Sequence, residues 1–116
     1  MEGSVSKFIG EYHHKVRFYE VDPYGIVHHS VYLLWAETGL QEFAEHEGLP
    51  GAYTIEKITC KYIFPARSGD DITLRIRIRR SLTDGEGRME GYVFAFDMTN
   101  GRSILAKGEI RTKQKV

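Results

Sequence analysis

The sequence predicts an α+β fold in which one antiparallel sheet of five strands curls around a single long helix. Three observations lead to this prediction: one unbroken helical pattern, several strand-like segments after it, and short turn signals between those segments. Wrapping the sheet around the helix buries the apolar surfaces of both at once. A chain of 116 residues has room for one compact core, so we expect residues 1–116 to form a single domain.

The helical pattern covers residues 30–47. This segment has no proline and no alternation, and apolar residues recur with helical spacing, beginning at Val31, Leu34 and Trp35. Ser30 is expected to cap the start of the helix, and Gly48 stands where a C-cap belongs. The segment is long enough for about five turns. Its small side chains would let another element approach closely; they are Ala36, Gly39 and Ala44.

Alternation of apolar and polar residues predicts the strands. We expect one short strand before the helix, at residues 16–20, and four more after Pro50, at residues 53–63, 72–81, 89–98 and 103–112. Asp84-Gly85 and Asn100-Gly101 supply the positive-φ residues of tight hairpin turns. The strands after the helix should therefore follow one another as a meander.

The strand at residues 72–81 has one apolar and one basic face. Ile72, Leu74, Ile76 and Ile78 alternate with Thr73, Arg75, Arg77 and Arg79. The arginine face could hold phosphates or an RNA backbone, or it could be a solvated face that discourages edge pairing. Sheets that bind RNA usually add a stripe of aromatic side chains. The aromatic stripe at Tyr92, Phe94 and Phe96 is better explained by packing against the helix.

The charge balance excludes a general attraction to anionic partners. Lys plus Arg equal Asp plus Glu, 16 against 16, so nucleic acid and anionic membranes are not expected partners. The distribution is nevertheless uneven, because residues 59–116 hold 12 basic and 7 acidic side chains. Part of the second half of the chain could therefore meet an anion.

Cysteine usage and hydropathy suggest the compartment. Cys60 is the only cysteine, which excludes an intrachain disulfide and a CxxC metal site and suits a reducing compartment. No run approaches the roughly 18 apolar residues of a membrane span, and the first residues lack the apolar core of a signal peptide. We therefore expect a cytoplasmic protein without a membrane span.

The most unusual stretch is residues 22–29, DPYGIVHH, between the first predicted strand and the helix. An acid in this position can face the unpaired N–H groups of the first helical turn, which combines a base with an oxyanion site. Thioester hydrolysis suits this arrangement, because the carbonyl oxygen takes up negative charge and a thiolate leaves without strong acid assistance. The alternative is an ordinary turn in which Asp22 accepts local N–H bonds and Gly25 adopts positive φ.

Other polar residues allow further interpretations. His28 and His29, with two more histidines upstream, raise the possibility of a metal site, but adjacent histidines point to opposite faces of an extended chain and no HxxxH spacing occurs. Catalysis without a metal or another cofactor is therefore the preferred prediction. Glu37 could line a cleft or be a solvated helix residue. Ser30 lacks the GxSxG setting of a serine nucleophile.

Two blocks of this sequence resemble a known family. VRFYEVDPYGIVHHSVYLLWAE, from Val16, and KYIFPARSGDDITLRIRI, from Lys61 to Ile78, are similar to motifs of hotdog-fold acyl-CoA thioesterases of the 4-hydroxybenzoyl-CoA thioesterase type. The resemblance implies a hotdog fold, in which a five-stranded sheet wraps around a long helix. It also implies homodimers whose sheets join, often paired into homotetramers, with the active site at the dimer interface.

The resemblance assigns roles to the loop residues. Asp22 matches the aspartate that acts as nucleophile or general base, and His29 matches the position whose backbone N–H binds the oxyanion. Gly25 matches the glycine of the close turn, and Ile26 and Val27 match its apolar pair. Two positions depart from the pattern: Phe18 replaces a tyrosine that short-chain relatives often carry, and Tyr24 fills a position that is commonly small. Tyr24 could reshape the acyl pocket.

These inferences predict a coenzyme A thioesterase. Asp22 is expected to supply the carboxylate, while the N–H groups of His29 and Ser30 polarise the thioester carbonyl. Tyr24, Ile26 and Val27 would contact the acyl-CoA substrate, and its phosphates would bind basic side chains, for which we single out Lys61, Arg67 and Arg77. The alternatives are a non-catalytic acyl-CoA or acyl-carrier-protein binding module, an RNA-associated sheet and a hotdog dehydratase. The loop position of Asp22 favours hydrolysis.

Overall fold

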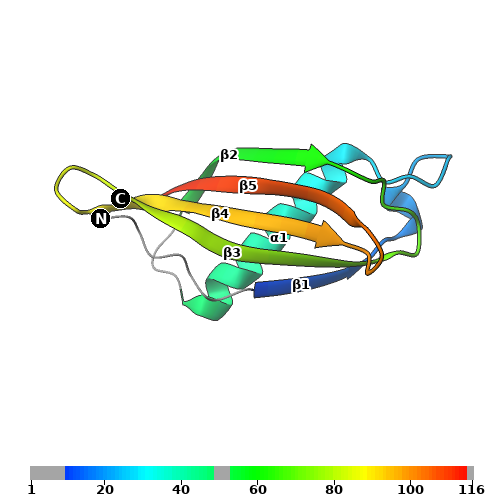
Figure 1. Cartoon of the computed structure of the whole chain (residues 1–116), viewed down its shortest axis with the longest axis horizontal. Coiled ribbons are helices and arrows are strands. Elements are labelled where there is room, and N and C mark those ends of the chain that lie inside the picture. The colour runs from blue at the N-terminus through cyan, green and yellow to red at the C-terminus, as the bar shows by residue number, and fades with distance from the viewer. Residues whose placement is uncertain (1–9, 49–52, 115–116) are drawn as a thin grey trace.

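The computed structural model describes residues 10–48 and 53–114, which form one sheet and one long helix. The elements in chain order are β1 (Gly10–Lys15), the short 3₁₀ helix η1 (Phe18–Glu20), α1 (His29–Glu47), β2 (Tyr53–Tyr62), β3 (Asp71–Thr83), β4 (Met89–Thr99) and β5 (Ile104–Gln114). The five strands pair antiparallel in the order β1-β3-β4-β5-β2, and α1 crosses one face of the sheet (Figure 1). The predicted hotdog fold is thereby confirmed.

The helix and the sheet meet in the main core. Ile72, Leu74 and Ile76 on β3 are buried toward α1, whereas Arg75 and Arg77 on the same strand are exposed, as the alternation predicted. Gly39 permits the close approach, because a Cβ atom there would lie 2.0 Å from Cδ2 of Leu74.

The aromatic stripe on β4 also belongs to this core. Phe94 and Phe96 are buried, and the ring of Phe94 makes an edge contact with that of Phe43 on α1, with centroids 6.0 Å apart. Packing against the helix, rather than base stacking, therefore accounts for these aromatic side chains.

The segment predicted as the first strand is different in the structure. Residues 16–20 do not form a strand: the strand that pairs with β3 is Gly10–Lys15, and Phe18–Glu20 forms η1. The turn forms because the backbone N–H of Glu20 donates to the carbonyl of Arg17 at 2.9 Å, and the Glu20 carboxylate accepts from the N–H of Arg17 at 2.8 Å. The alternation of VRFYE thus belongs to a side-chain-stabilised turn.

Two local predictions were also wrong. The helix begins one residue before Ser30, and its N-cap is His28, which makes no side-chain capping hydrogen bond. In the β3–β4 hairpin the positive φ, +80°, belongs to Gly87 and not to Gly85. Asp84 sets that turn by accepting hydrogen bonds from the backbone N–H groups of Glu86 and Arg88. The helix ends before Gly48, as predicted.

Across residues 10–48 and 53–114, no helix combines the length and the apolar character needed to cross a membrane.

Candidate active site

The loop that carries Asp22 closes on itself. Val21 pairs with Val27 as an isolated bridge, and the N–H of Asp22 donates to the carbonyl of Ile26 at 2.9 Å. Oδ1 of Asp22 accepts hydrogen bonds from the N–H of Tyr24 at 2.8 Å and from the N–H of Ile26 at 3.1 Å. One carboxylate oxygen is therefore used to shape the loop, as the turn alternative predicted. Among the described residues, Oδ2 has no hydrogen-bond partner.

Gly25 gives the loop its sharp reversal. Its φ is +77°, and its N–H donates to the carbonyl of Asp22 at 2.9 Å. No atom lies within 4 Å of a Cβ built at Gly25, so conformation and not space is what requires glycine.

The segment before β3 holds the loop in place. The N–H of Val27 donates to the carbonyl of Ala66 at 2.9 Å, and the N–H of Ser68 donates to that of Gly25 at 3.3 Å. Ile26 forms an isolated bridge with Arg67. The N–H of Ala66 donates to the buried hydroxyl of Tyr32 on α1 at 2.8 Å. Backbone hydrogen bonds thus tie the loop to the segment before β3, and the Tyr32 hydroxyl ties that segment to the helix.

The start of α1 presents unpaired donors. The N–H of Val31 donates to the carbonyl of His28 at 3.0 Å, whereas among the described residues the N–H groups of His29 and Ser30 have no acceptor. Both residues are exposed. The first N–H groups of a helix lack intrahelical partners and lie at the positive end of its dipole. This helix start can therefore stabilise a developing negative charge.

Tyr62, at the end of β2, packs against His29. Their rings stack with centroids 3.8 Å apart and an interplanar angle of 5°, and the Tyr62 hydroxyl donates to the carbonyl of His29 at 3.2 Å. Burial is the main cause that raises the pKa of Tyr62 above its ordinary value. The neutral phenol is therefore favoured, and it holds the first helical residue in position. The sequence analysis did not assign Tyr62 a role, although the second family-like block contains it.

Glu20 is a second residue that the sequence analysis missed. Its carboxylate is buried and accepts from the Nε1–H of Trp35 at 3.0 Å and from the N–H of Arg17, and it lies 2.8 Å from Nε2 of His14. The carboxylate thus links β1, η1 and α1. Its backbone carbonyl also accepts from the N–H of His28 at 3.4 Å. The only signal was an acid at the end of an alternating pattern, and the sequence analysis assigned Glu20 no role.

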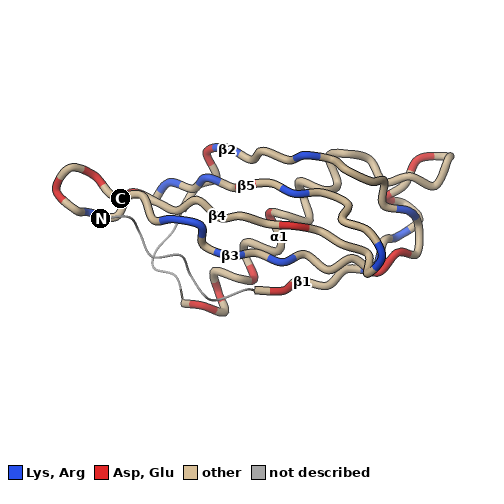
Figure 2. The backbone as a smooth tube through the Cα atoms, in the orientation of Figure 1, with Lys and Arg blue, Asp and Glu red and all other residues tan. Residues whose placement is uncertain are grey.

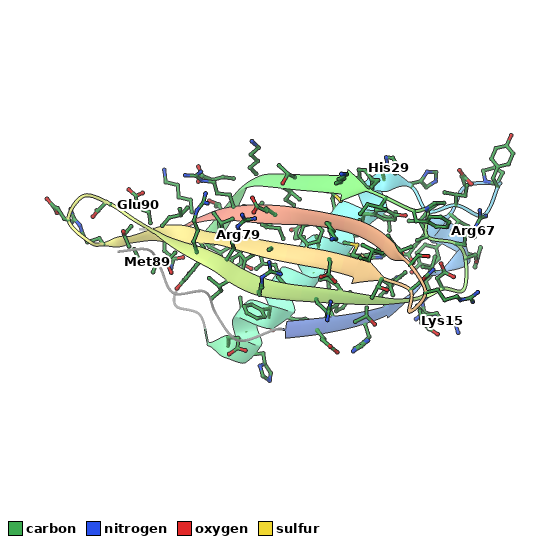
Figure 3. The ribbon with its side chains drawn as sticks, viewed as in Figure 1. Lys15, His29, Arg67, Arg79, Met89 and Glu90 are labelled. Atoms are coloured by element: carbon green, nitrogen blue, oxygen red, sulfur yellow. The ribbon has the colours of Figure 1, made fainter. Side chains whose placement is uncertain are left out.

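The remaining predicted site residues lie either at the loop or on the face of the sheet that is turned away from α1. Arg67 lies at the same end of the molecule as His29, opposite Met89 and Glu90 at the far end (Figure 3). Tyr24 projects into solvent with 85% exposure, Val27 is buried, and Ile26 is half-buried. Lys61 and Arg77 point from the face of the sheet that is turned away from α1.

The structure separates the two predicted phosphate-binding positions on the sheet. Lys61 is the neighbour of Tyr62 in β2, at the end where Tyr62 contacts His29. Arg77 lies six residues into β3, about 20 Å along the strand from its start. Lys61 and Arg67 are therefore near the loop, and Arg77 is not.

The described histidine side chains do not form a cluster. His14 lies against Glu20, while His13 lies 3.2 Å from the carboxylate of Glu11 and 3.3 Å from the hydroxyl of Thr73. His28 and His29 lie at the helix start. Within the described ranges, no group of three or more His, Cys, Asp or Glu side chains has the arrangement of a metal site. Glu37 is an exposed helix residue.

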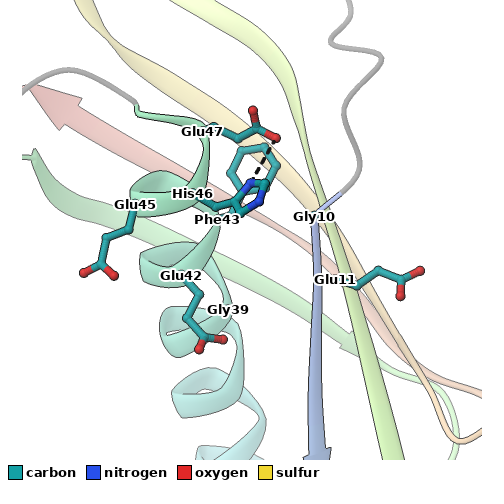
Figure 4. A pocket seen from close by; sticks show the side chains of 8 residues that line it. All are labelled: Gly10, Glu11, Gly39, Glu42, Phe43, Glu45, His46 and Glu47. Atoms are coloured by element: carbon teal, nitrogen blue, oxygen red, sulfur yellow. Dashed lines mark ion pairs between the residues drawn. The ribbon is translucent and has the colours of Figure 1, made fainter.

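A cavity of about 610 Å³ lies elsewhere, at the C-terminal end of α1 (Figure 4). Carboxylates dominate its lining, at Glu11, Glu42, Glu45 and Glu47. This end lies about 27 Å along the helix from His29, at about 1.5 Å per residue. Its negative charge opposes the binding of an anionic substrate, so the loop and the helix start remain the candidate active site.

The conformation of Gly25 leads to a stability prediction. We expect Gly25→Ala to lower the free energy of unfolding by about 1–2 kcal/mol, because a Cβ atom disfavours positive φ. The matched control is Gly85→Ala, since Gly85 also has no atom within 4 Å of a built Cβ but does not have a positive φ. Urea unfolding measures both variants, and equal effects in the two would contradict this role of Gly25.

Comparisons with known proteins show the fold and the family of this chain. The family model of the thioesterase superfamily matches residues 24–82, about half of the chain, beginning just after Asp22. A chloroplastic acyl-acyl carrier protein thioesterase of Arabidopsis thaliana is 33% identical over 114 residues, and the match covers 88% of this chain. The chain spans only 58% of the length of that relative.

Solved structures share the architecture. A probable thioesterase from Bartonella henselae superposes with a TM-score of 0.79 at 18% identity, covering 91% of this chain and 90% of the other. A 1,4-dihydroxy-2-naphthoyl-CoA thioesterase from Synechocystis gives a TM-score of 0.77 at 14% identity, covering 91% and 81%. At these identities the likeness concerns the fold, while the family match rests on the sequence. The chain belongs to the thioesterase superfamily.

Proposed function

We propose that this chain hydrolyses acyl thioesters, with Asp22 as the reacting carboxylate. The observation that carries the proposal is the pairing of two features on one rigid loop. Asp22 keeps one oxygen without a partner among the described residues, and the loop leads directly into the unpaired N–H groups of His29 and Ser30. A carboxylate next to an oxyanion site is what acyl transfer requires.

The reaction can follow two routes from the same geometry. As a nucleophile, Asp22 attacks the thioester carbon, the thiolate leaves, and water hydrolyses the resulting mixed anhydride to release the acid and restore the carboxylate. As a general base, Asp22 takes a proton from water while the water oxygen attacks the same carbon. In both routes the carbonyl oxygen becomes negative, and the N–H groups of His29 and Ser30 stabilise it.

The substrate belongs to one of two classes. The Synechocystis structure is that of an aromatic acyl-CoA thioesterase, whereas the Arabidopsis relative is named for acyl groups on a carrier protein. We assign this chain to the acyl-CoA thioesterases of the 4-hydroxybenzoyl-CoA type, with Lys61 and Arg67 near enough to the loop to contact the phosphates. Coenzyme A enters as part of the substrate, and no other cofactor is proposed. Tyr24, whose side chain is exposed on the loop, is proposed to contact the acyl group.

We also propose that a second copy of the chain completes the site, as a homodimer or a dimer of dimers. Exposed large apolar residues support this, because most of them surround the loop, the helix start and the end of β2. They are Phe18, Tyr19, Tyr24, Leu34, Ile63 and Phe64. Contiguous exposed apolar surface usually marks a site of association or ligand binding.

Thiol release from a panel of acyl thioesters tests the proposal. The panel contains short, long and aromatic acyl-CoAs, and a thiol-reactive chromophore measures hydrolysis. We expect turnover with at least one class, and light scattering on the same sample to give the mass of a dimer or tetramer. Thermal stabilisation by acyl-CoA without thiol release would instead support a non-catalytic acyl-CoA or acyl-carrier-protein binding module. Full activity in a monomer would contradict the shared site.

A further inference from the structure

The face of the sheet turned away from α1 carries a basic surface that extends well beyond the candidate active site. Its exposed basic side chains project from β2, β3 and β5, and Figure 2 marks the Lys and Arg positions along the backbone of those strands. Some are neutralised, since Arg75 pairs with Asp97, Arg79 with Glu109 and Arg111 with Glu56. Others form no ion pair with any described residue. These define the outer cationic face: Lys57, Lys61, Arg77, Arg80, Lys107 and Lys113.

The strand register places Arg80 and Lys57 in one row across the sheet, together with the paired Arg111. Arg80 lies opposite Val93, Val93 opposite Arg111, and Arg111 opposite Lys57. Neighbouring strands are about 4.8 Å apart, so this row spans about 14 Å. The small Val93 leaves a shallow depression of about 130 Å³ between the long basic side chains. A shallow, ridged surface of this size suits a macromolecular partner better than an enclosed small molecule.

The composition of the face favours protein over nucleic acid. Within the described strands β2 to β5, no side chain on this face is aromatic. Single-stranded RNA is usually held by stacking on aromatic rings. The aromatic side chains of β4 point into the core instead. An acidic protein surface needs only complementary charge.

A second copy of this chain fits less well. Two outer cationic faces would repel one another, so a symmetric contact between them is unfavourable. A contact with the acidic helix side of another copy would join different surfaces and build a ring or a filament, not the proposed homodimer or dimer of dimers. The partner that complements this face is therefore a different, acidic protein.

The face also reaches the candidate active site. Lys61 is one of its members, and the next residue, Tyr62, stacks on His29. Lys57 lies four residues before Lys61, about 13 Å away at about 3.3 Å per residue. A protein bound over the rows can thus deliver a flexible arm past Lys61 to the helix start.

We propose that the outer cationic face docks an acidic acyl carrier protein, which presents an acyl thioester to the Asp22 loop as a second substrate class beside acyl-CoA. This inference rests on the proposed thioester hydrolysis for its catalytic part, while the docking itself does not. The carrier's acidic surface lies over Lys57 and Arg80, and its thioester arm extends toward His29.

The test compares one acyl group on two carriers. A double variant, Lys57→Glu with Arg80→Glu, reverses two exposed charges that lie outside the loop and outside the phosphate-binding candidates. We expect the KM for the acyl carrier protein thioester to rise about tenfold or more, because charge complementarity is lost. Kinetic constants for the same acyl group on coenzyme A should stay within about twofold. The controls are Arg102→Glu, on the β4–β5 turn, and the neutral pair Lys57→Gln with Arg80→Gln.

A direct binding measurement separates docking from catalysis. Fluorescence anisotropy with labelled, unloaded acyl carrier protein should show binding that weakens with added salt and weakens about tenfold in the charge-reversed variant. Binding without any hydrolysis would support the docking and refute the proposed function. Hydrolysis of acyl-CoA with equal carrier binding by wild type and variant would refute the docking alone.

Two further outcomes would overturn the proposal in favour of other partners. Salt-dependent binding of an oligouridylate that the double variant loses, without carrier binding, would identify a nucleic-acid surface. Wild-type assemblies that disappear in the double variant would identify the face as a contact between copies.

Discussion

Asp22→Asn is expected to reduce kcat by a factor of about 10² to 10⁴ while leaving the fold intact. The amide keeps an Oδ1 atom that can accept the hydrogen bonds from the N–H groups of Tyr24 and Ile26, so the loop retains its shape. The amide cannot act as a base or as a carboxylate nucleophile, and groups in these roles supply factors of this size. Thiol release at saturating substrate measures the loss, and urea unfolding checks the stability.

The companion variant is Asp22→Ala, which removes the chemistry and the loop hydrogen bonds together. We expect it to be as inactive as Asp22→Asn but less stable by about 1–2 kcal/mol, since two backbone N–H groups lose their acceptor. Activity retained in Asp22→Asn would remove the carboxylate from the mechanism. A covalent acyl-enzyme trapped by rapid quenching of wild type would select the nucleophilic route over the general-base route.

Glu20→Gln is expected to lower the free energy of unfolding by about 2 kcal/mol at pH 7. Two N–H groups, from Arg17 and Trp35, point at the two carboxylate oxygens. An amide has only one oxygen, so in either orientation its NH₂ group must face one of these donors. Hydrogen bonds to charged groups contribute about 1.5–3 kcal/mol, and this substitution removes at least one. Urea unfolding measures the difference.

The matched control is Glu11→Gln. Glu11 and Glu20 each contact one of two adjacent histidines, His13 and His14, but the Glu11–His13 pair is exposed whereas Glu20 is buried. Exposed pairs contribute little, so Glu11→Gln should change stability by less than about 0.5 kcal/mol. Equal effects of the two substitutions would show that burial of Glu20 has no part in its contribution.

The pKa of Glu20 gives this contribution a pH dependence. Burial alone would raise the pKa, but the hydrogen bonds from Arg17, His14 and Trp35 outweigh it and hold the pKa below its ordinary value. The unfolded chain therefore takes up a proton more readily than the folded chain. The stabilisation is complete above the unfolded pKa of about 4.3 and is lost as the pH falls through the folded value. The difference in the free energy of unfolding between wild type and Glu20→Gln should thus narrow as the pH falls through the lowered pKa of Glu20.

The regular elements were predictable because their residue patterns are local. The alternation of Ile72 to Ile78 and the helical spacing from Val31 onward depend only on which side of an element faces the core. This reasoning fails for residues 16–20, because their alternation belongs to a turn that Glu20 stabilises. Trp35, which donates a hydrogen bond to Glu20, lies 15 residues away in the sequence. Periodicity carries no information about such a contact.

For the site, the loop with Asp22 and Gly25, its connection to the helix start and the family resemblance could all be predicted from the sequence. The surroundings of that loop appear only in the folded molecule: Tyr62 stacks on His29, Glu20 accepts from Trp35, Arg67 lies beside Ile26, and Arg77 lies far away on the outer face. The physical reason is that turns and helix ends are set by neighbouring residues. Packing partners and charge neighbours are set by strand register and by the way α1 lies across the sheet.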